Sequence, residues 1–207
     1  MKAPEPVVLE GERVRLEPLG PQHREDLVAA AGEDPQIFRY MGMNIPMHGW
    51  DAWLAEAQAG VAAGRYVAWA TVDRASGRAV GSTRFGDIAP ADGRVEIGWT
   101  WIAPSQQRTA ANTEAKLLQL GYAFDELGAT RVALKTDARN LRSQAAIERI
   151  GGVREGVLRR HLRVADGFIR DTVYYSILDD EWPAVKARLT ERLTRDGREV
   201  PPDRLDG

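Results

Sequence analysis

Residues 107–110 and 112–114 are the part of this chain whose side chains most clearly suggest a chemical task. A strand-like segment, residues 99–103, leads into a polar turn there, and a helical pattern follows. The first N–H groups of a helix have no partner within the helix and lie at the positive end of its dipole. The stretch therefore predicts an anion site suited to phosphate. The alternative is that Thr109 or Asn112 only caps the helix.

The composition limits what the chain can do. Its 207 residues, 43% of them hydrophobic, suffice for one domain with its own core. The 28 basic and 30 acidic residues give a net charge of -2 without a long basic run, which disfavours a role in binding DNA or other nucleic acids. There is no cysteine, so thiol nucleophiles, disulfides and cysteine metal sites are excluded. We expect no metal cofactor.

The N-terminal residues do not show the pattern of a secretory signal. Residues 1–6 contain proline and charge where a secretory signal would be apolar, and no run approaches the roughly 20 apolar residues of a membrane span. These features predict a cytoplasmic protein with no membrane partner. We expect one domain over residues 1–195, followed by a loose, charged and proline-bearing tail over residues 196–207.

Changes in hydrophobic period predict alternating strands and helices, and thus an α/β (α+β) fold. Strand patterns lie near residues 14–19, 66–72, 79–85, 94–102, 131–136, 153–164 and 168–178, and helical patterns near 23–31, 50–61, 112–127, 141–150 and 179–193. The strand, helix and strand over 94–136 form a parallel crossover unit, whereas the turns at 74–77, 91–93 and 165–167 predict hairpins. In the helix after residue 112, Glu114 and Lys116 are expected on the polar outer face.

Four short motifs, taken in order, resemble the GNAT superfamily of acetyl-CoA-dependent N-acetyltransferases, and within it the ribosomal-protein N-terminal acetyltransferases. They are LEGERVRLEPL at residues 9–19, EIGW at 96–99, NLRS at 140–143 and YYSI at 174–177. The resemblance covers nearly all of the chain. It implies one central, mixed and mostly antiparallel sheet of about seven strands, splayed between the fourth and fifth strands and flanked by helices.

The resemblance also implies a site for acetyl-CoA as cosubstrate. An exposed strand edge can bind the amides of the pantetheine arm as if the arm were another strand. The backbone of Trp101, Ile102 and Ala103 would form this edge. The turn and helix start would hold the pyrophosphate, through Gln107, Arg108, Thr109, Ala110, Ala111, Asn112 and Thr113. Ala110 and Asn112 replace the small, flexible residues of the family's usual turn.

By the same resemblance, the reaction is direct attack of an amine on the thioester in a ternary complex. Many relatives protonate the leaving thiolate with a tyrosine, but Ile147 occupies that position here. The ribosomal-protein subgroup has a serine instead, which matches Ser143, while Asn140 would bind the cofactor arm. The alternative is that Asn140 caps the helix and Ser143 merely lies in its first turn.

Several residues could serve as the general base. Lys135 stands where some relatives carry a glutamate on the fifth strand, so that base is absent. His161 titrates near neutral pH and is the first candidate, although a lone histidine in a strand is more often structural. Glu96, acting through water, is the rival, and Asp171 is a third choice.

The acceptor amine is less well defined. Tyr40, Met41, Trp50 and Trp53 are expected to form an apolar wall, while Arg159, Arg160, Arg163 and Arg170 gather positive charge that suits an acidic peptide. An α-amine, with a pKa near roughly 7.7–8.0, loses its proton more easily than a lysine, which favours a protein or peptide N-terminus. A small-molecule amine or antibiotic acetyltransferase and a non-catalytic acyl-CoA-binding regulator are the alternatives. A homodimer is left open.

Overall fold

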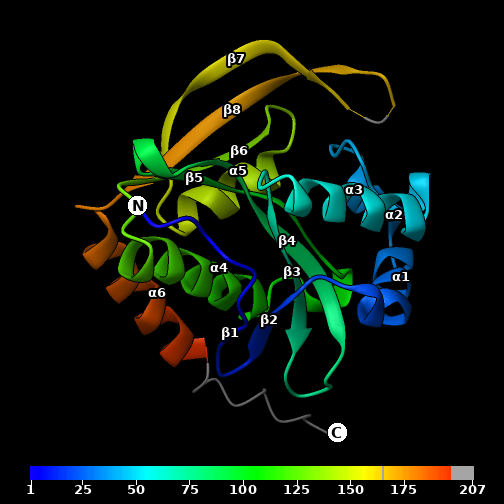
Figure 1. Cartoon of the computed structure of the whole chain (residues 1–207), viewed down its shortest axis with the longest axis horizontal. Coiled ribbons are helices and arrows are strands. Elements are labelled where there is room, and N and C mark those ends of the chain that lie inside the picture. The colour runs from blue at the N-terminus through cyan, green and yellow to red at the C-terminus, as the bar shows by residue number, and fades with distance from the viewer. Residues whose placement is uncertain (165, 197–207) are drawn as a thin grey trace, which may run out of the picture.

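Eight strands form a single sheet in the order β1-β2-β3-β4-β5-β6-β8-β7 in the computed structural model, which describes residues 1–164 and 166–196 (Figure 1). The strands are β1 (Leu9–Glu10), β2 (Val14–Pro18), β3 (Val67–Asp73), β4 (Ala79–Ala89), β5 (Arg94–Ile102), β6 (Arg131–Asp137), β7 (Val153–Arg163) and β8 (Ile169–Leu178). All seven predicted strands are present. The count differs by β1, a two-residue edge strand too short to show a period.

The five predicted helices are also present. The helices are α1 (Arg24–Gly32), α2 (Ile45–His48), α3 (Trp50–Ala62), α4 (Ala111–Gly121), α5 (Leu141–Arg149) and α6 (Trp182–Asp196). The short α2 lies between two predicted helices, where no element was assigned, and a π-helical turn extends α4 over Tyr122–Glu126. No helix within the described residues is long and apolar enough to cross a membrane. Of the predicted tail over residues 196–207, Asp196 is the last residue of α6, and residues 197–207 lie outside the described residues, as does Ala165 of the predicted hairpin turn.

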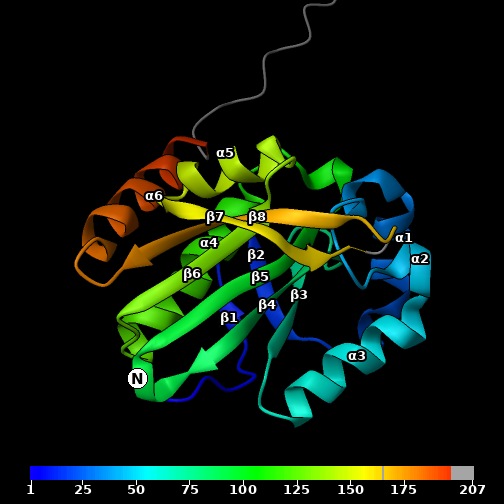
Figure 2. The ribbon, with the colours of Figure 1, turned by 90° about the horizontal axis from the view of Figure 1, so that it is seen from above.

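The sheet is antiparallel except where β5 and β6 run side by side (Figure 2). These two strands pair in parallel only from Arg94 with Arg131 to Ile97 with Leu134, and they diverge beyond that point. The divergence coincides with a bulge in β5, where Trp99 has a φ of 52° and the register against β4 shifts. A bulge bends its strand, so it explains why the pairing stops there. The predicted splay between the fourth and fifth strands is confirmed.

Two apolar layers cover the two faces of the sheet. One joins α4, α5 and α6 to the strands through side chains such as Trp69, Leu120, Tyr175 and Trp182. The other joins α1, α2 and α3 to the opposite face, around Trp53 and residues of β3, β4 and β5. Both layers pack against strands whose side chains alternate between the faces, which fixes the register of the sheet.

The polar face expected for α4 is wrong at its first turns. Glu114 is 5% exposed, and its carboxylate accepts hydrogen bonds from the backbone N–H groups of Glu12, Arg13 and Val14 at 3.1, 2.7 and 2.7 Å. Lys116 is 4% exposed. Glu114 therefore ties the start of β2 to the helix that begins at the predicted anion site, an arrangement that the helical period cannot reveal.

Candidate functional site

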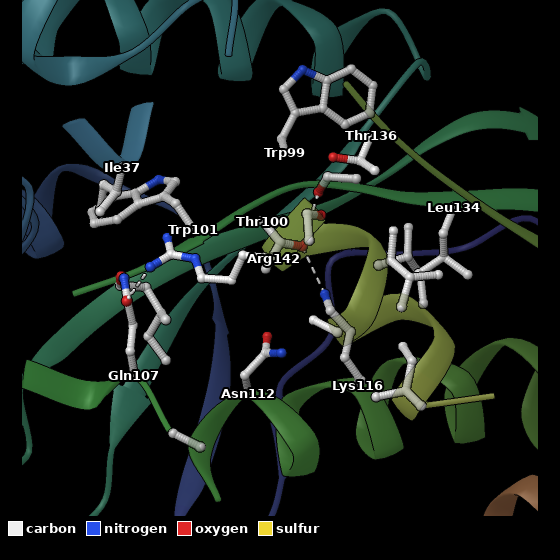
Figure 3. A pocket seen from close by; sticks show the side chains of 18 of the residues that line it. Ile37, Trp99, Thr100, Trp101, Gln107, Asn112, Lys116, Leu134, Thr136 and Arg142 are labelled. Atoms are coloured by element: carbon white, nitrogen blue, oxygen red, sulfur yellow. Dashed lines mark hydrogen bonds between the residues drawn. The ribbon is translucent and has the colours of Figure 1, made fainter. Parts of the chain in front are cut away.

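A cleft of about 1890 Å³ opens where β5 and β6 diverge, above the start of α4 (Figure 3). Most of the predicted site residues line it: Glu96, Trp101, Ile102, Gln107, Arg108, Thr109, Ala110, Ala111, Asn112, Thr113, Asn140 and Ser143. Ala103 and His161 do not. The structure therefore brings together segments that are up to about fifty positions apart in the chain, and it does so at the predicted splay.

The start of α4 presents unpaired backbone N–H groups to this cleft. Ala110 precedes the helix with helical dihedral angles, and no side chain caps the end in the usual way. The Thr109 hydroxyl accepts a hydrogen bond from the Ala111 N–H at 3.2 Å, whereas the described residues offer no acceptor to the N–H groups of Asn112 and Thr113. The Asn112 side chain rises from the helix toward the cleft (Figure 3). Unpaired N–H groups at a helix start suit an anion.

The turn before α4 is held open by its own hydrogen bonds. Arg108 has a φ of 64°, the left-handed conformation that most residues avoid. The Thr109 hydroxyl donates to the Gln106 carbonyl at 2.8 Å. Because Ala110 is helical, its methyl group needs no glycine-like backbone, so alanine is compatible with this turn.

The open edge of β5 is narrower than predicted. The Ala103 N–H donates to the Val80 carbonyl at 2.8 Å, so this residue faces β4 and is 1% exposed. Successive residues of a strand direct their backbone groups to opposite sides, so Ile102 faces the cleft while Trp101 shares the direction of Ala103. Thr100 belongs to the bulge, where this alternation is interrupted, and it also lines the cleft. The Gln107 side chain donates to the Ile102 carbonyl at 3.2 Å, as this orientation requires. The backbone of Trp101 and Ala103 is thus directed to β4, which leaves Ile102 as the open part of the predicted edge, and Thr100 was not predicted.

Gln107 also connects the turn to α5. Arg142 donates from Nη1 to the Gln107 side-chain oxygen at 2.8 Å across the mouth of the cleft (Figure 3). Arg142 lines the cleft. It was not predicted, because the resemblance gave roles only to Asn140 and Ser143 of the NLRS motif. With Arg108 it adds positive charge near the start of α4, which suits a diphosphate.

Asn140 and Ser143 lie at the start of α5, where both line the cleft. The Asn140 side-chain oxygen accepts a hydrogen bond from the Ser143 N–H at 3.1 Å, so the capping alternative holds for Asn140. Its side-chain NH₂ group remains for a ligand. Ile147, one turn further along, is 7% exposed and supplies no proton donor.

Glu96 lies at the inner end of the cleft, just before the strands diverge. Its carboxylate pairs with Lys135 at 2.8 Å, and its side chain is 3% exposed. Burial raises the pKa of Glu96, and the Lys135 ammonium opposes that rise. Lys135 thus forms, across neighbouring strands, an ion pair whose carboxylate is buried and whose lysine is partly exposed.

His161 lies beside the cleft and not in it. Its ring packs against Tyr174 with centroids 5.7 Å apart, and its buried Nδ1 has no hydrogen-bond partner among the described residues. Burial, together with the positive charges of Lys135 and Arg170, lowers the pKa of His161. A neutral imidazole near Lys135 is consistent with a base. Asp171 is already engaged, because its carboxylate accepts the Arg160 N–H at 2.7 Å.

The expected apolar wall is only partly present. Tyr40 and Met41 line the cleft, but Trp50 and Trp53 are 5% and 2% exposed in the core between α3 and the sheet. Among the expected arginines, Arg163 and Arg170 line the cleft, whereas Arg159 and Arg160 do not. Arg170 is anchored by hydrogen bonds to the Tyr40 carbonyl and the Thr172 hydroxyl, both at 3.1 Å.

Lys116 is the buried cleft residue that the sequence did not single out. Its ammonium donates to the hydroxyls of Thr83 and Thr100 and to the side-chain oxygen of Gln119, at 2.9, 2.7 and 2.8 Å. Burial lowers the pKa of Lys116 to about 7. No ion pair links it to a carboxylate among the described residues. A lysine at this position of a helical pattern gave no signal of burial.

The arrangement can hold an extended anionic ligand with a reactive end. Phosphate would lie at the start of α4, amides along the edge of β5, and the reacting atoms near Thr100, Ser143 and Glu96. The part of the chain that the structure describes contains no group of three or more histidine, aspartate or glutamate side chains placed to hold a metal ion.

Comparison with solved structures supports this interpretation. A GCN5-related N-acetyltransferase from Brucella melitensis is 36% identical, with a TM-score of 0.86 over 92% of this chain and 87% of that one. RimJ from Mycobacterium smegmatis, solved with CoA-disulfide, has a TM-score of 0.77 over 90% of this chain and 95% of its own; at 23% identity it shows a shared fold.

Sequence comparison agrees. The Bacillus subtilis (strain 168) protein YdaF, provisionally named a ribosomal N-acetyltransferase, is 41% identical over 93 residues, which are 45% of this chain and 50% of YdaF. The match thus spans half the length of that relative. The family profile described as an acetyltransferase (GNAT) domain matches residues 13–153. This chain therefore belongs to the GNAT family of acetyltransferases.

Proposed function

We propose that this protein transfers an acetyl group from acetyl-CoA to the N-terminal α-amine of a protein or peptide, by direct attack in a ternary complex. The observation that carries the proposal is the start of α4, whose free N–H groups at Asn112 and Thr113 open into the same cleft as the unpaired edge of β5. A diphosphate and an amide-bearing arm match these two features in order.

When bound, acetyl-CoA supplies an acetyl group activated as a thioester. The Asn112 and Thr113 N–H groups and the Arg142 guanidinium would hold the diphosphate. Ile102 and Thr100 would bind the arm through their backbone, and the Asn140 NH₂ group would donate to it. Ser143 Oγ would give a proton to the leaving sulfur. His161, or Glu96 through water, would take the proton of the amine.

Two observations favour an α-amine. The pKa of His161 is lowered, so its imidazole is neutral near pH 7 and can accept a proton from an amine of pKa roughly 7.7–8.0 more easily than from a lysine at about 10.4. The match to YdaF, a protein provisionally named for ribosomal acetylation, extends over 93 residues and favours the same class of acceptor.

An acceptor screen tests the proposal. Peptides with a free N-terminus, the same peptides with a blocked N-terminus, polyamines and aminoglycosides are each mixed with acetyl-CoA, and released thiol is measured; the chain has no cysteine to add background. We expect thiol release with free N-termini and none with blocked ones. Turnover on polyamines or aminoglycosides alone would establish the small-molecule alternative. Binding of acetyl-CoA without turnover on any amine would favour a regulator.

A further inference from the structure

Lys116 is buried under the cleft at the bulge of β5. Its side chain extends from α4 to the underside of the sheet and meets the Thr100 hydroxyl at 2.7 Å (Figure 3). Thr83, one strand further in, is 1% exposed and Gln119 is fully buried. Thr100, in contrast, is exposed and lines the cleft. The network therefore runs from a buried amine to a hydroxyl at the surface of the site.

Burying this amine is costly for the fold. A charged group out of water is tolerated when an opposite charge or a metal compensates it. The three partners of Lys116 are neutral, and no described carboxylate pairs with it. Glu96 and Lys135 in the same cleft form an ion pair with no net charge, and Arg170 is a further cation there. An anion that enters the cleft would thus supply the negative charge that the three partners of Lys116 lack.

The position of Thr100 indicates which anion this is. A ligand whose diphosphate lies at Asn112 and whose arm follows β5 inward passes Ile102 before Thr100, and the strands close at Ile97. Its reactive end therefore comes to lie near Thr100. In CoA that end is a sulfur, which is anionic when it departs from an acyl group.

We propose that Lys116 is a positioning residue for this sulfur: its ammonium, acting through the Thr100 hydroxyl, favours the thiolate form of CoA in the cleft. The inference rests on the proposed function, because it requires CoA in this site. In the ligand-free protein burial lowers the pKa of Lys116 to about 7, but the negative charge on sulfur raises it again in the CoA complex, so Lys116 keeps its proton beside the thiolate. The amine forms the N–C bond and loses one proton, the C–S bond breaks with its electron pair on sulfur, and the amine's proton finally reaches sulfur.

The test measures the thiol of bound CoA directly. Thiolate absorbs in the ultraviolet, and since the chain has no cysteine, the signal of a CoA complex comes from the ligand, with the S-methyl-CoA complex as blank. For the unaltered protein we expect the thiol to ionise about one pH unit or more below free CoA in the same buffer. In Lys116→Met it should ionise at or above the free value. Equal ionisation in both proteins would overturn the proposal.

Matched variants separate this role from a structural one. Lys186→Met removes an exposed lysine of α6 that pairs with Asp125, and the thiol should ionise as in the unaltered protein. Thr100→Val should move ionisation toward the free value. Thr83→Val removes a hydroxyl that contacts both Lys116 and the Thr100 hydroxyl, at 2.9 and 2.8 Å, but lies outside the cleft, so it should move ionisation less. Equal effects of the two valine variants would contradict the route through Thr100.

Ligand-free stability provides an independent readout. Methionine fills similar space without charge, so Lys116→Met should unfold at the same or a higher temperature than the unaltered protein. If Lys116→Met does not fold, Lys116 is required for folding. The ionisation of CoA bound to Thr100→Val then tests whether the Thr100 hydroxyl acts on the sulfur. Calorimetry with CoA distinguishes the two levels of failure. If CoA does not bind at all, the proposed function is wrong. If CoA binds but its thiol ionises at the same pH as that of free CoA, only this inference is wrong.

Discussion

Ser143 and Asn140 both lie at the start of α5, but their substitution by alanine is expected to have different effects. Ser143→Ala removes the proposed proton donor, so turnover should fall by about 10²-fold or more while CoA affinity is kept. Asn140→Ala removes a cap and an arm contact, so affinity and stability should both fall, the latter by about 1 kcal/mol. Steady-state kinetics with calorimetry separates the two. Unchanged turnover in Ser143→Ala would remove it from the mechanism.

His161 and Glu96 are rivals for the base, and pH dependence discriminates between them. Because the pKa of His161 is lowered below its usual 6.5, the acid limb of the pH–rate profile should fall below that value. His161→Ala should abolish this limb, and Glu96→Gln should leave its midpoint in place. A profile of His161→Ala that matches the unaltered protein would eliminate the histidine and leave Glu96.

Lys116 makes the stability of the protein depend on pH in a definite direction. Its pKa is about 7 in the folded state, so between roughly pH 7 and the lysine value of about 10.4 the unfolded chain holds one more proton. The free energy of unfolding therefore rises with pH across that window. Below the window the amine is charged in the folded protein, and the full cost of burying that charge lowers the stability. The advantage of Lys116→Met in denaturant unfolding should be largest below about pH 7 and shrink by pH 9. An advantage that grows with pH would contradict the burial argument.

At the scale of elements, α4 contributes to the stability of the fold and also provides the proposed diphosphate site. A negative charge at its start should affect the two in opposite directions. Asn112→Asp places a negative charge at the positive end of its dipole, which should stabilise the free protein by about 0.3–1 kcal/mol. The same charge would repel a diphosphate, so CoA should bind more weakly. Thermal unfolding with and without CoA measures both, and Asn112→Ala is the uncharged control. Unchanged affinity in Asn112→Asp would show that the diphosphate does not lie there.

The elements themselves could be predicted because each carries a clear period. All seven expected strands and five expected helices are found, and β1 was missed since two residues have no period. The burial of Glu114 and Lys116 was not predictable in this way, because it depends on partners outside α4, such as Val14 for Glu114 and Thr83 for Lys116. Trp50 and Trp53 were assigned to the cleft for a similar reason: an aromatic residue suits a wall and a core equally.

At the scale of the whole molecule, the site follows from how the sheet is assembled. The cleft exists because the parallel pairing of β5 and β6 stops at Ile97 and Leu134, and the helices after these strands both begin at its mouth. The order of motifs predicted many of the residues that line the cleft, since residues 107–113 are adjacent along the chain. His161 was harder to place, because β7 reaches the site only through β8.

Ligand binding should be visible in the stability of the whole molecule. A ligand at about one hundred times its dissociation constant stabilises the folded state by roughly 2.7 kcal/mol, which for a domain of this size is about 5–11 °C in melting temperature. We expect acetyl-CoA to produce a shift of that order. Adenosine, which lacks the diphosphate and the arm, should produce little. No shift at saturating acetyl-CoA would count against every assignment in the cleft.

The most direct test of the central claim localises the acetyl group. A peptide with both a free N-terminal amine and an internal lysine is incubated with the protein and acetyl-CoA, and fragment mass spectrometry identifies the modified nitrogen. We expect the acetyl group on the α-amine, with the lysine unmodified. Acetylation of the lysine alone, or of neither amine while small-molecule amines react, would contradict the account.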